Sequence, residues 1–536
     1  MLAPPGPQAA GRLARWTAAH PRWTALALGA LAALGFPPLQ LWPVALLAMG
    51  GFVLLLWQAR TSSARMAFTL GWLFGVAHYT VTNNWIATAF TFQAEMPAAL
   101  GWVAVPLLSL YLAVYPGLAA LAAHQLGRKH SAAAFIWLFG ACWIAAEWLK
   151  SWVFTGYAWG PFSLALVGPF DRPGLAAVLP VIGTYALSGL AVVLAGFLVL
   201  LLAERRWRVF ALTAGLLAIG MYWPARPVPQ GTLPVTLVQP DFRQEEIDDP
   251  AKFEEQFVRI AQLSVPKQPG TRRLVLWPES GVPDYLRDGY PQRYYDQLTA
   301  AGDPRFARTR IGAVVGPDSL LLTGAVDLEI ADTGGYAHAV GAYNAVTAID
   351  GAGTIRASYY KAHLVPYGEY LALRWLLEPL GATRLVAGTL DFIPGPGPRT
   401  LDLGQWGEAG VQICYEIIFS GQVVDPANRP DYLFNPSNDG WFGAWGPPQH
   451  LAQARMRAAE EGLPVLRSTT TGISAIISAD GVVRHHIGMH RAERIDTLVP
   501  PAAEPTLFAR MGHWLTLLWA VLLAAGSLVA MRRERR

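Results

Sequence analysis

Three polar residues follow strand-like runs in the second half of the chain, where a strand end would hold them firmly. Glu279 follows "VLWP", Lys361 follows "RASYY", and Cys414 follows "GVQI". A cysteine attacks an acyl carbonyl only if one group removes its proton and another stabilises the oxyanion. A carboxylate with a raised pKa can be that base, and an ammonium group can stabilise the oxyanion. The three residue types therefore predict cysteine-based acyl chemistry.

Each of these residues also has an ordinary structural explanation. Cys414 could be a small buried apolar residue, as most cysteines within strand-like runs are. Glu279 could cap a helix, Lys361 could be a solvated lysine, and Glu369 could pair with Arg374 on the surface. The chain has only two cysteines, and the other lies in an apolar stretch. Cys414 therefore has no disulfide partner in its own half of the chain, which favours either a buried thiol or a catalytic one.

The first half of the chain has the composition of a membrane protein. Charged residues make up 15% of the whole chain, against about 25% in soluble domains. Only nine charged residues fall between Trp23 and Ala203. A membrane span needs about 20 mainly apolar residues. We therefore expect about eight spans, near 22–36, 39–58, 66–90, 98–124, 133–150, 175–203, 208–223 and 512–531.

Basic residues are distributed unevenly among the loops between these spans. If the N-terminus is cytoplasmic, fourteen Arg or Lys residues lie in loops and tails on that side and two in the opposite short loops. By the positive-inside rule, both termini are cytoplasmic. We therefore predict an N-terminal membrane domain (1–223), an outer domain (224–505), and a final span with a basic tail (506–536). In a Gram-negative inner membrane, the outer domain would be periplasmic.

Residues 224–505 alternate strand-like with helix-like segments, which is typical of a layered α/β domain. Asp-Gly pairs at 350–351 and 480–481 indicate hairpins between strands. Helices are predicted at 252–264 and 447–462, the latter with proline near its start and glycine at its end. The expected strands are 233–239, 273–279, 320–326, 343–349, 410–416, 431–437 and 464–478.

The ordered motifs "WPES", "HLVPYGEYLALR", "CYEIIF", "NPSNDGWFG" and "RSTTTGISAII" resemble the nitrilase superfamily. That resemblance implies an α-β-β-α sandwich with a Glu-Lys-Cys triad. With the membrane part included, the chain resembles the membrane-embedded branch of that superfamily, the apolipoprotein N-acyltransferases. The resemblance implies Glu279 as general base, Lys361 as oxyanion stabiliser and Cys414 as nucleophile. The residues it implies as supporting the site are Glu369, Tyr415 and Glu416.

One family feature is missing. The family often has a tryptophan about ten residues after its first strand, whereas the stretch 239–253 of this chain contains none. The contact is then absent or supplied by Phe242 or Phe253.

The resemblance implies a two-step acyl transfer. Cys414 would take the sn-1 acyl chain of a phospholipid, typically phosphatidylethanolamine, as a thioester. The α-amino group of the diacylglyceryl-cysteine of an apolipoprotein would then accept it. No cofactor, metal or nucleic acid is implied, and nothing demands more than a monomer. The alternative is a membrane-tethered nitrilase or amidase that hydrolyses a small carbon–nitrogen substrate, which leaves the eight spans unexplained.

Two apolar stretches of the outer domain are candidates for contact with lipid. A thioester must be protected from water, so apolar segments near the site are expected. They could form arms that enter the outer leaflet, or they could pack on the domain core. The predicted lipid-facing residues are Trp375, Leu376 and Leu377 in the first stretch and Trp441, Phe442 and Trp445 in the second.

Overall fold

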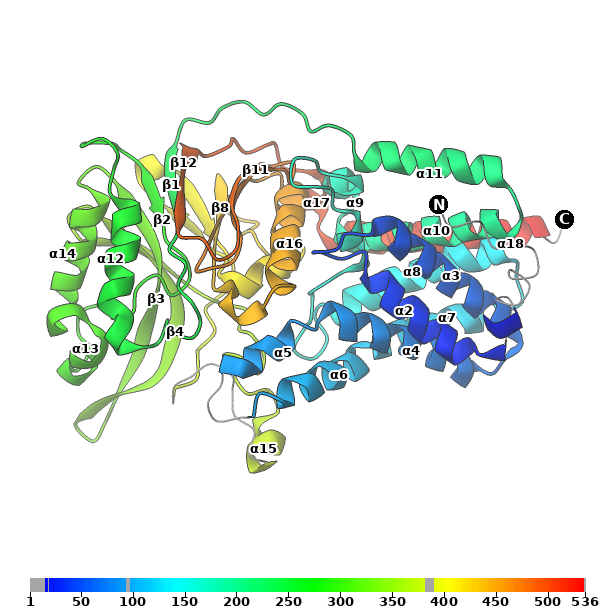
Figure 1. Cartoon of the computed structure of the whole chain (residues 1–536), viewed down its shortest axis with the longest axis horizontal. Helices are drawn as coiled ribbons and strands as arrows, with labels where there is room; N and C mark the ends of the chain where they lie inside the picture. The colour runs from blue at the N-terminus through cyan, green and yellow to red at the C-terminus, as the bar shows by residue number, and fades with distance from the viewer. Residues whose placement is uncertain (1–14, 18, 93–96, 381–389, 535–536) are drawn as a thin grey trace.

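The computed structural model describes residues 15–17, 19–92, 97–380 and 390–534. A helical bundle and a two-sheet α/β domain lie end to end, and one helix, α16 (Gly446–Glu461), lies between them (Figure 1). The chain enters the bundle first, crosses to the sheets after residue 223, and returns to the bundle for its last helix.

The bundle contains all the helices that the apolar stretches predict. Among the described residues, five helices are long and apolar enough to cross a membrane: Trp42–Thr61, Leu100–Gly127, Ala132–Lys150, Thr184–Ala203 and His513–Glu534. The other predicted spans also form helices, which are shorter or less apolar. The bundle helices are α2 (Pro21–Ala33), α3 (Trp42–Gln58), α4 (Ala64–Thr82), α5 (Ile86–Ala89), α6 (Leu100–Leu112), α7 (Val114–Gly127), α8 (Ala132–Lys150), α9 (Leu179–Ile182), α10 (Thr184–Ala203), α11 (Trp207–Met221), α17 (Leu507–Met511) and α18 (His513–Glu534).

Two predicted spans are shorter in the structure than in the sequence. The stretch predicted at 66–90 leaves its helix at Thr82 and continues as a turn and the short helix α5. The stretch predicted at 175–203 forms one helix only from Thr184, because Gly183 adopts a φ of +78° that an α-helix cannot accommodate.

The α/β domain consists of two six-stranded sheets, with orders β12-β1-β2-β3-β4-β5 and β11-β10-β9-β8-β7-β6. The central strands β1–β3 and β7–β9 run parallel within each sheet, and the outer strands are antiparallel. The strands are β1 (Pro234–Gln239), β2 (Leu274–Leu276), β3 (Leu320–Thr333), β4 (Tyr336–Asp350), β5 (Ile355–Tyr360), β6 (Thr400–Asp402), β7 (Glu408–Val411), β8 (Tyr432–Ser437), β9 (Val465–Thr469), β10 (Ser474–Ile477), β11 (Val483–Ile487) and β12 (Glu493–Leu498).

The sheets pack face to face, and helices cover their outer faces. Along β2, Leu274 and Leu276 face the core between the sheets, while Val275 faces α12 (Phe253–Ser264) and α14 (Pro304–Val315). This alternation follows from the two-residue period of a strand. The predicted α/β layers, the helices at 252–264 and 447–462, and both Asp-Gly hairpins are therefore confirmed. The run 464–478, predicted as one strand, instead forms the hairpin β9–β10.

Helix α16 joins the two parts because both of its faces are buried. Leu451, Ala454 and Ala458 pack in the core with the sheets, whereas Met456 and Ala459 pack with the bundle. Within each set the positions are three or four residues apart, so each set forms one face of the helix.

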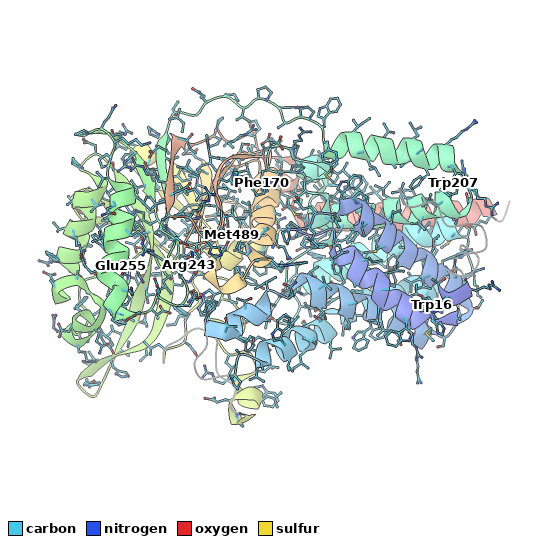
Figure 2. The ribbon with its side chains drawn as sticks, viewed as in Figure 1. Trp16, Phe170, Trp207, Arg243, Glu255 and Met489 are labelled. Carbon is cyan, nitrogen blue, oxygen red and sulfur yellow. The ribbon has the colours of Figure 1, made fainter. Side chains whose placement is uncertain are left out.

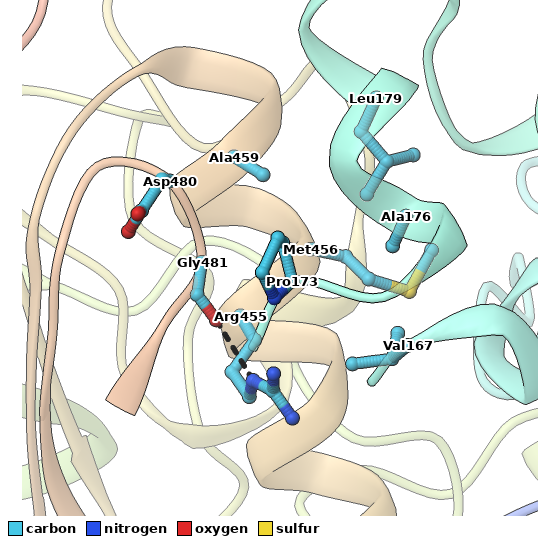
Figure 3. Close-up of a pocket in the computed structure, with 9 residues that line it drawn as sticks. All are labelled: Val167, Pro173, Ala176, Leu179, Arg455, Met456, Ala459, Asp480 and Gly481. Carbon is cyan, nitrogen blue, oxygen red and sulfur yellow. Dashed lines mark hydrogen bonds between the residues drawn. The ribbon is translucent and has the colours of Figure 1, made fainter. Parts of the chain in front are cut away.

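Polar side chains of α16 add directional contacts to this junction. Arg455 is 1% exposed, and its guanidinium donates to the carbonyls of Gly168, Pro169 and Arg172 in the bundle. It also donates to the carbonyl of Gly481 of the α/β domain at 2.8 Å, and both residues line a small cavity at the junction (Figure 3). The junction is thus close-packed and hydrogen-bonded.

The ends of the molecule show how the parts are oriented. Trp16 and Trp207 lie at the end of the bundle farthest from the sheets, and Glu255 lies on the outer helix layer at the opposite end (Figure 2). The α/β domain therefore extends from one end of the bundle only.

Candidate active site

Glu279 lies just beyond β2, after Trp277 and Pro278, and is 7% exposed. Its Oε1 accepts a hydrogen bond from Asn344 Nδ2 at 2.8 Å, and its Oε2 accepts one from the backbone N–H of Asn438 at 2.7 Å. Strand β3 passes so close that a Cβ on Gly324 would lie 2.6 Å from the Cα of Glu279. Each oxygen of the Glu279 carboxylate thus accepts a hydrogen bond from a different segment of the domain.

Lys361 follows β5 and is 1% exposed. Its Nζ lies 3.0 Å from Glu369 Oε1 and 3.5 Å from Glu279 Oε1. Burial alone lowers the pKa of this ammonium, but Glu369 and then Glu279 outweigh it, so the pKa is raised above its usual value. Lys361 therefore carries a positive charge beside Glu279.

Cys414 begins the 3₁₀ turn η9 (Cys414–Ile418), is 5% exposed, and has a φ of +50°. Burial, and then the charge of Glu279, raise the pKa of its thiol well above the usual value, while Lys361 opposes this. The same three groups interact electrostatically, so the structure brings together the predicted Glu279, Lys361 and Cys414. The thiol is protonated at neutral pH and needs a base to become a nucleophile.

Glu416 links the loop after β5 to the turn that carries Cys414. Its Oε1 accepts from the Tyr359 hydroxyl at 2.9 Å and from the N–H groups of Ala362 and His363 at 2.7 and 3.2 Å. Its Oε2 accepts from the N–H of Ile413 at 2.8 Å. Burial raises the pKa of Glu416 to about 7 although these donors oppose the shift. The carboxylate therefore ties the Lys361 loop to the cysteine turn.

Asn344 on β4 was not singled out by the sequence analysis. Its Nδ2 donates to Glu279 Oε1 at 2.8 Å and to Glu369 Oε1 at 2.9 Å, so one amide aligns both carboxylates. Glu369 also accepts from the N–H of Val365 at 2.8 Å. The available signal was a lone amide residue inside an otherwise apolar strand, "YNAVTAI".

The stretch 239–253, which lacks the family's tryptophan, is connected to the site through Gln244. Phe242 is 3% exposed and packs in the core under the outer helices, and Phe253 begins α12. Gln244 instead accepts a hydrogen bond from Asn438 Nδ2 at 2.8 Å. Asn438 in turn donates to Glu279, so Gln244 is the residue of this loop connected to the site.

Tyr415 is buried against the bundle. Its hydroxyl donates to the carbonyl of Gly156 at 3.4 Å, and its ring meets Phe419 edge to face. The residue after Cys414 therefore contacts the loop that follows α8. Its N–H lies in the first turn of η9, where helical N–H groups lack intrahelical acceptors.

The predicted lipid-facing residues fall into two groups. Trp375 and Leu376 are 76% and 45% exposed on the one-turn helix α15 (Arg374–Leu377), which projects beside α5 and α6, clear of the sheets (Figure 1). The side chain of Leu377 lies outside the described residues. Trp441 is half-buried and meets Phe92 of the bundle at 5.9 Å.

Phe442 differs from the lipid-facing prediction. It is 9% exposed, and its ring packs against Trp85 and Trp159 of the bundle at centroid distances of 4.7 and 5.7 Å. The reason is that aromatic residues of the bundle cover Phe442, so its ring is not available for contact with lipid. Trp445 is only partly buried and lines a crevice at the same junction.

This crevice has a volume of about 190 Å³ and lies between α5, α6 and the segment before α16. Two aromatic residues of the bundle, Trp85 and Trp102, line it together with Trp445 of the α/β domain. Its lining residues are Asn84, Trp85, Ala87, Thr88, Thr91, Trp102, Ala444 and Trp445.

Comparisons with known proteins agree with this arrangement. Residues 28–197 match the family model described as the apolipoprotein N-acyltransferase N-terminal domain, and residues 235–489 match that of carbon-nitrogen hydrolases. The chain is 32% identical to an apolipoprotein N-acyltransferase of Rhodopseudomonas palustris, with 95% of each chain covered. It is 28% identical to one of Vibrio vulnificus, with 95% of this chain and 96% of the relative covered.

Two of the solved structures to which part of this chain is similar are an amidase and a carbon-nitrogen hydrolase. An amidase from Nesterenkonia sp. AN1 is 18% identical and covers 52% of this chain and 94% of its own, with a TM-score of 0.34. A carbon-nitrogen hydrolase from Helicobacter pylori is 14% identical, with 54% and 94% covered and a TM-score of 0.34. Because a relative that is 32% identical covers 95% of this chain, and both family models match, the chain belongs to the apolipoprotein N-acyltransferase family of the nitrilase superfamily.

Proposed function

We propose that this protein moves an sn-1 acyl chain from a phospholipid, typically phosphatidylethanolamine, to the α-amino group of a diacylated apolipoprotein. The observation that carries the proposal is the meeting of Glu279, Lys361 and Cys414 in one buried site at the junction with an apolar helical bundle. A buried thiol, a carboxylate and a fixed ammonium group are what acyl transfer through a thioester requires.

In the first step, the Glu279 carboxylate takes the proton of the Cys414 thiol. The thiolate sulfur attacks the ester carbonyl carbon, and the oxyanion is stabilised by Lys361 and the N–H of Tyr415. The carbon–oxygen bond then breaks, the lysophospholipid oxygen takes the proton from Glu279, and a thioester remains on Cys414.

In the second step, the apolipoprotein amine attacks the thioester carbonyl and gives its proton to Glu279. The carbon–sulfur bond breaks, and Glu279 returns the proton to the Cys414 sulfur. The free enzyme is restored, so the two half-reactions form a ping-pong cycle. Glu369 and Asn344 hold Lys361 and Glu279 in place throughout, and Glu416 holds the turn of Cys414.

The crevice at the junction suits an acyl donor that arrives from the membrane. Trp85 is 8% exposed, and its Nε1 has no hydrogen-bond partner among the described residues. Tryptophan side chains favour the interface between hydrocarbon and headgroups. We assign the crevice to the donor lipid, and the exposed Trp375 and Leu376 of α15 to contact with the outer leaflet.

We propose a monomeric enzyme of the bacterial inner membrane, with a membrane domain over 1–223, a periplasmic domain over 224–505 and a final span with its tail over 506–536. Eight spans would put both termini on one side of the membrane, and the basic loops favour the cytoplasm as that side. In support, Glu534 near the C-terminus accepts hydrogen bonds from Ser131 at the start of α8. The basic residues Arg128 and Lys129 and the basic C-terminal tail are thus close to one another.

Mass spectrometry of the intact protein after incubation with phosphatidylethanolamine tests the function. We expect a mass increase of one acyl chain on Cys414, and its loss when a diacylated lipopeptide is added. An adduct that persists in Cys414→Ala would refute the proposal. For the topology, a periplasm-dependent reporter inserted at residue 300 should be active, and activity of a cytoplasm-dependent reporter there would contradict the orientation.

A further inference from the structure

The backbone of Cys414 adopts a conformation that a cysteine does not favour. Its φ of +50° lies in the left-handed region, where a Cβ approaches the carbonyl oxygen. Some interaction of the folded protein must hold the residue there. The hydrogen bonds of Glu416 fix the neighbouring Ile413, but they do not reach the Cys414 carbonyl.

His450 of α16 is the side chain with the shortest hydrogen bond to this carbonyl. The imidazole is fully buried, and its Nε2 lies 3.0 Å from the Cys414 oxygen. Asn435 Nδ2 is the second side-chain contact, at 3.5 Å, and its shorter hydrogen bond goes to the Gln412 carbonyl at 2.6 Å. The hydrogen bond from His450 is therefore the stronger of the two.

The partners of His450 determine where its proton lies. A backbone carbonyl can only accept, so Nε2 must carry the proton that faces Cys414. On the other side, Nδ1 lies 3.1 Å from Arg467 Nη2 and 3.0 Å from Asp439 Oδ1. Arg467 also donates to both oxygens of Asp439, at 2.8 and 2.7 Å. Burial, and then the charge of Arg467, lower the pKa of His450, while Asp439 and the Cys414 carbonyl oppose the shift.

The same network reaches the other side of the catalytic site. Asp439 directly follows Asn438, whose N–H donates to Glu279 Oε2 at 2.7 Å. The His450 ring packs against Trp159 and Phe442 at 5.2 and 5.7 Å. His450 is therefore fixed by charged groups on one side and by aromatic groups of the domain junction on the other.

We propose that His450 is a positioning residue: its Nε2–H holds the Cys414 carbonyl, and so keeps Cys414 in the left-handed conformation that directs the sulfur toward Glu279 and Lys361. This role rests on the proposed acyl transfer, although the geometry that it describes does not depend on the substrate. His450 neither touches the acyl chain nor exchanges a proton with it.

Two substitutions of the same chemical class separate this role from simple stabilisation. In His450→Gln the amide nitrogen can occupy the position of Nε2, whereas in His450→Asn the amide is too short to reach the carbonyl. Leu451→Ala is the matched control, because Leu451 is the adjacent buried residue of α16 and packs only in the apolar core. Melting temperatures of all three variants report on the loss of stability.

The first readout is the single-turnover rate of acyl-enzyme formation with phosphatidylethanolamine. We expect His450→Asn to lower it by about 10- to 100-fold, because small displacements of a reacting atom have effects of that size. The half-saturating lipid concentration should stay within about threefold, and His450→Gln should recover to within about fivefold of the unaltered protein. The pH profile should keep its shape in every variant.

The second readout is alkylation of Cys414 by iodoacetamide, which needs no phospholipid. A lower alkylation rate in His450→Asn, with recovery in His450→Gln, would support the positioning role even if no acyl-enzyme formed, so failure of the proposed function would be recognised separately. Equal rates in His450→Asn and the unaltered protein would overturn the inference. So would a changed pH profile without recovery in His450→Gln, because the imidazole would then be a titrating catalytic group.

Discussion

The substitution Glu369→Gln tests how the charge of Lys361 is maintained. Glu369 is the nearer of its two carboxylates, at 3.0 Å against 3.5 Å for Glu279. At an effective dielectric constant near 20, these distances correspond to attractions of about 5.5 and about 4.7 kcal/mol before desolvation is counted. Glutamine keeps the shape of the side chain but removes the larger attraction.

Loss of the attraction between Glu369 and Lys361 should lower both the free energy of unfolding and the rate of acyl-enzyme formation. Removing one partner of a buried ion pair destabilises a protein by about 3 to 5 kcal/mol, and Glu279 remains as a partner, so we expect the lower end, about 3 kcal/mol. Glu279 then becomes the carboxylate nearest to Lys361 among the described residues, at 3.5 Å, and is less available as a base. If half of the lost attraction reaches the transition state, about 2.7 kcal/mol, acyl-enzyme formation slows about 100-fold.

The assay is a time course of acyl-enzyme mass with phosphatidylethanolamine in mixed micelles, together with a melting curve. Glu378→Gln is the control, since it also removes a carboxylate but from an exposed pair, 3.8 Å from Arg374. Exposed pairs contribute about 0 to 1 kcal/mol, so both measurements should be unchanged. A Glu369→Gln rate within threefold of the unaltered protein would refute the reasoning.

Four further changes have defined outcomes. Asn344→Leu leaves two buried carboxylates without their shared donor, and thermal unfolding should show a loss of about 1 to 3 kcal/mol; an unchanged melting temperature would contradict this. Because burial raises the pKa of Cys414, stability should fall above pH about 8.5, where only the unfolded thiol ionises; calorimetry should find this slope absent in Cys414→Ser. Phe442→Ala should cost about 3 to 5 kcal/mol at the domain junction, and a smaller loss by chemical denaturation would count against its packing role. The double change Trp375→Ser and Leu376→Ser should leave stability within about 0.5 kcal/mol and slow turnover of bilayer phospholipid, and unchanged turnover would reject contact of α15 with lipid.

Several features could be predicted because their signals are local. Apolar stretches of span length are a property of the chain itself, and each of them forms a helix in the described bundle. Alternation and turn residues likewise predicted β1, β8 and both Asp-Gly hairpins. The chemistry of Glu279, Lys361 and Cys414 was suggested by residue type at strand ends, and the structure brings the three together.

The network around these residues was not predictable, because its members are separated along the chain. Asn344 lies 65 positions from Glu279, and His450 lies 36 from Cys414, so their contacts depend on strand register and on where α16 crosses the sheet. Phe442 shows the same limit: an aromatic residue in a polar loop has the same local pattern whether lipid or another domain covers it.

The amino-acid order alone therefore determined which segments are apolar helices, which are strands, and which reactive groups the α/β domain carries, since these follow from properties of neighbouring residues. Only the tertiary structure decided how α16 joins the two parts, which carboxylate lies closest to Lys361, and what holds the Cys414 carbonyl. Those features depend on distances of 3 to 4 Å between distant segments, and such distances are set by the packing of the whole fold.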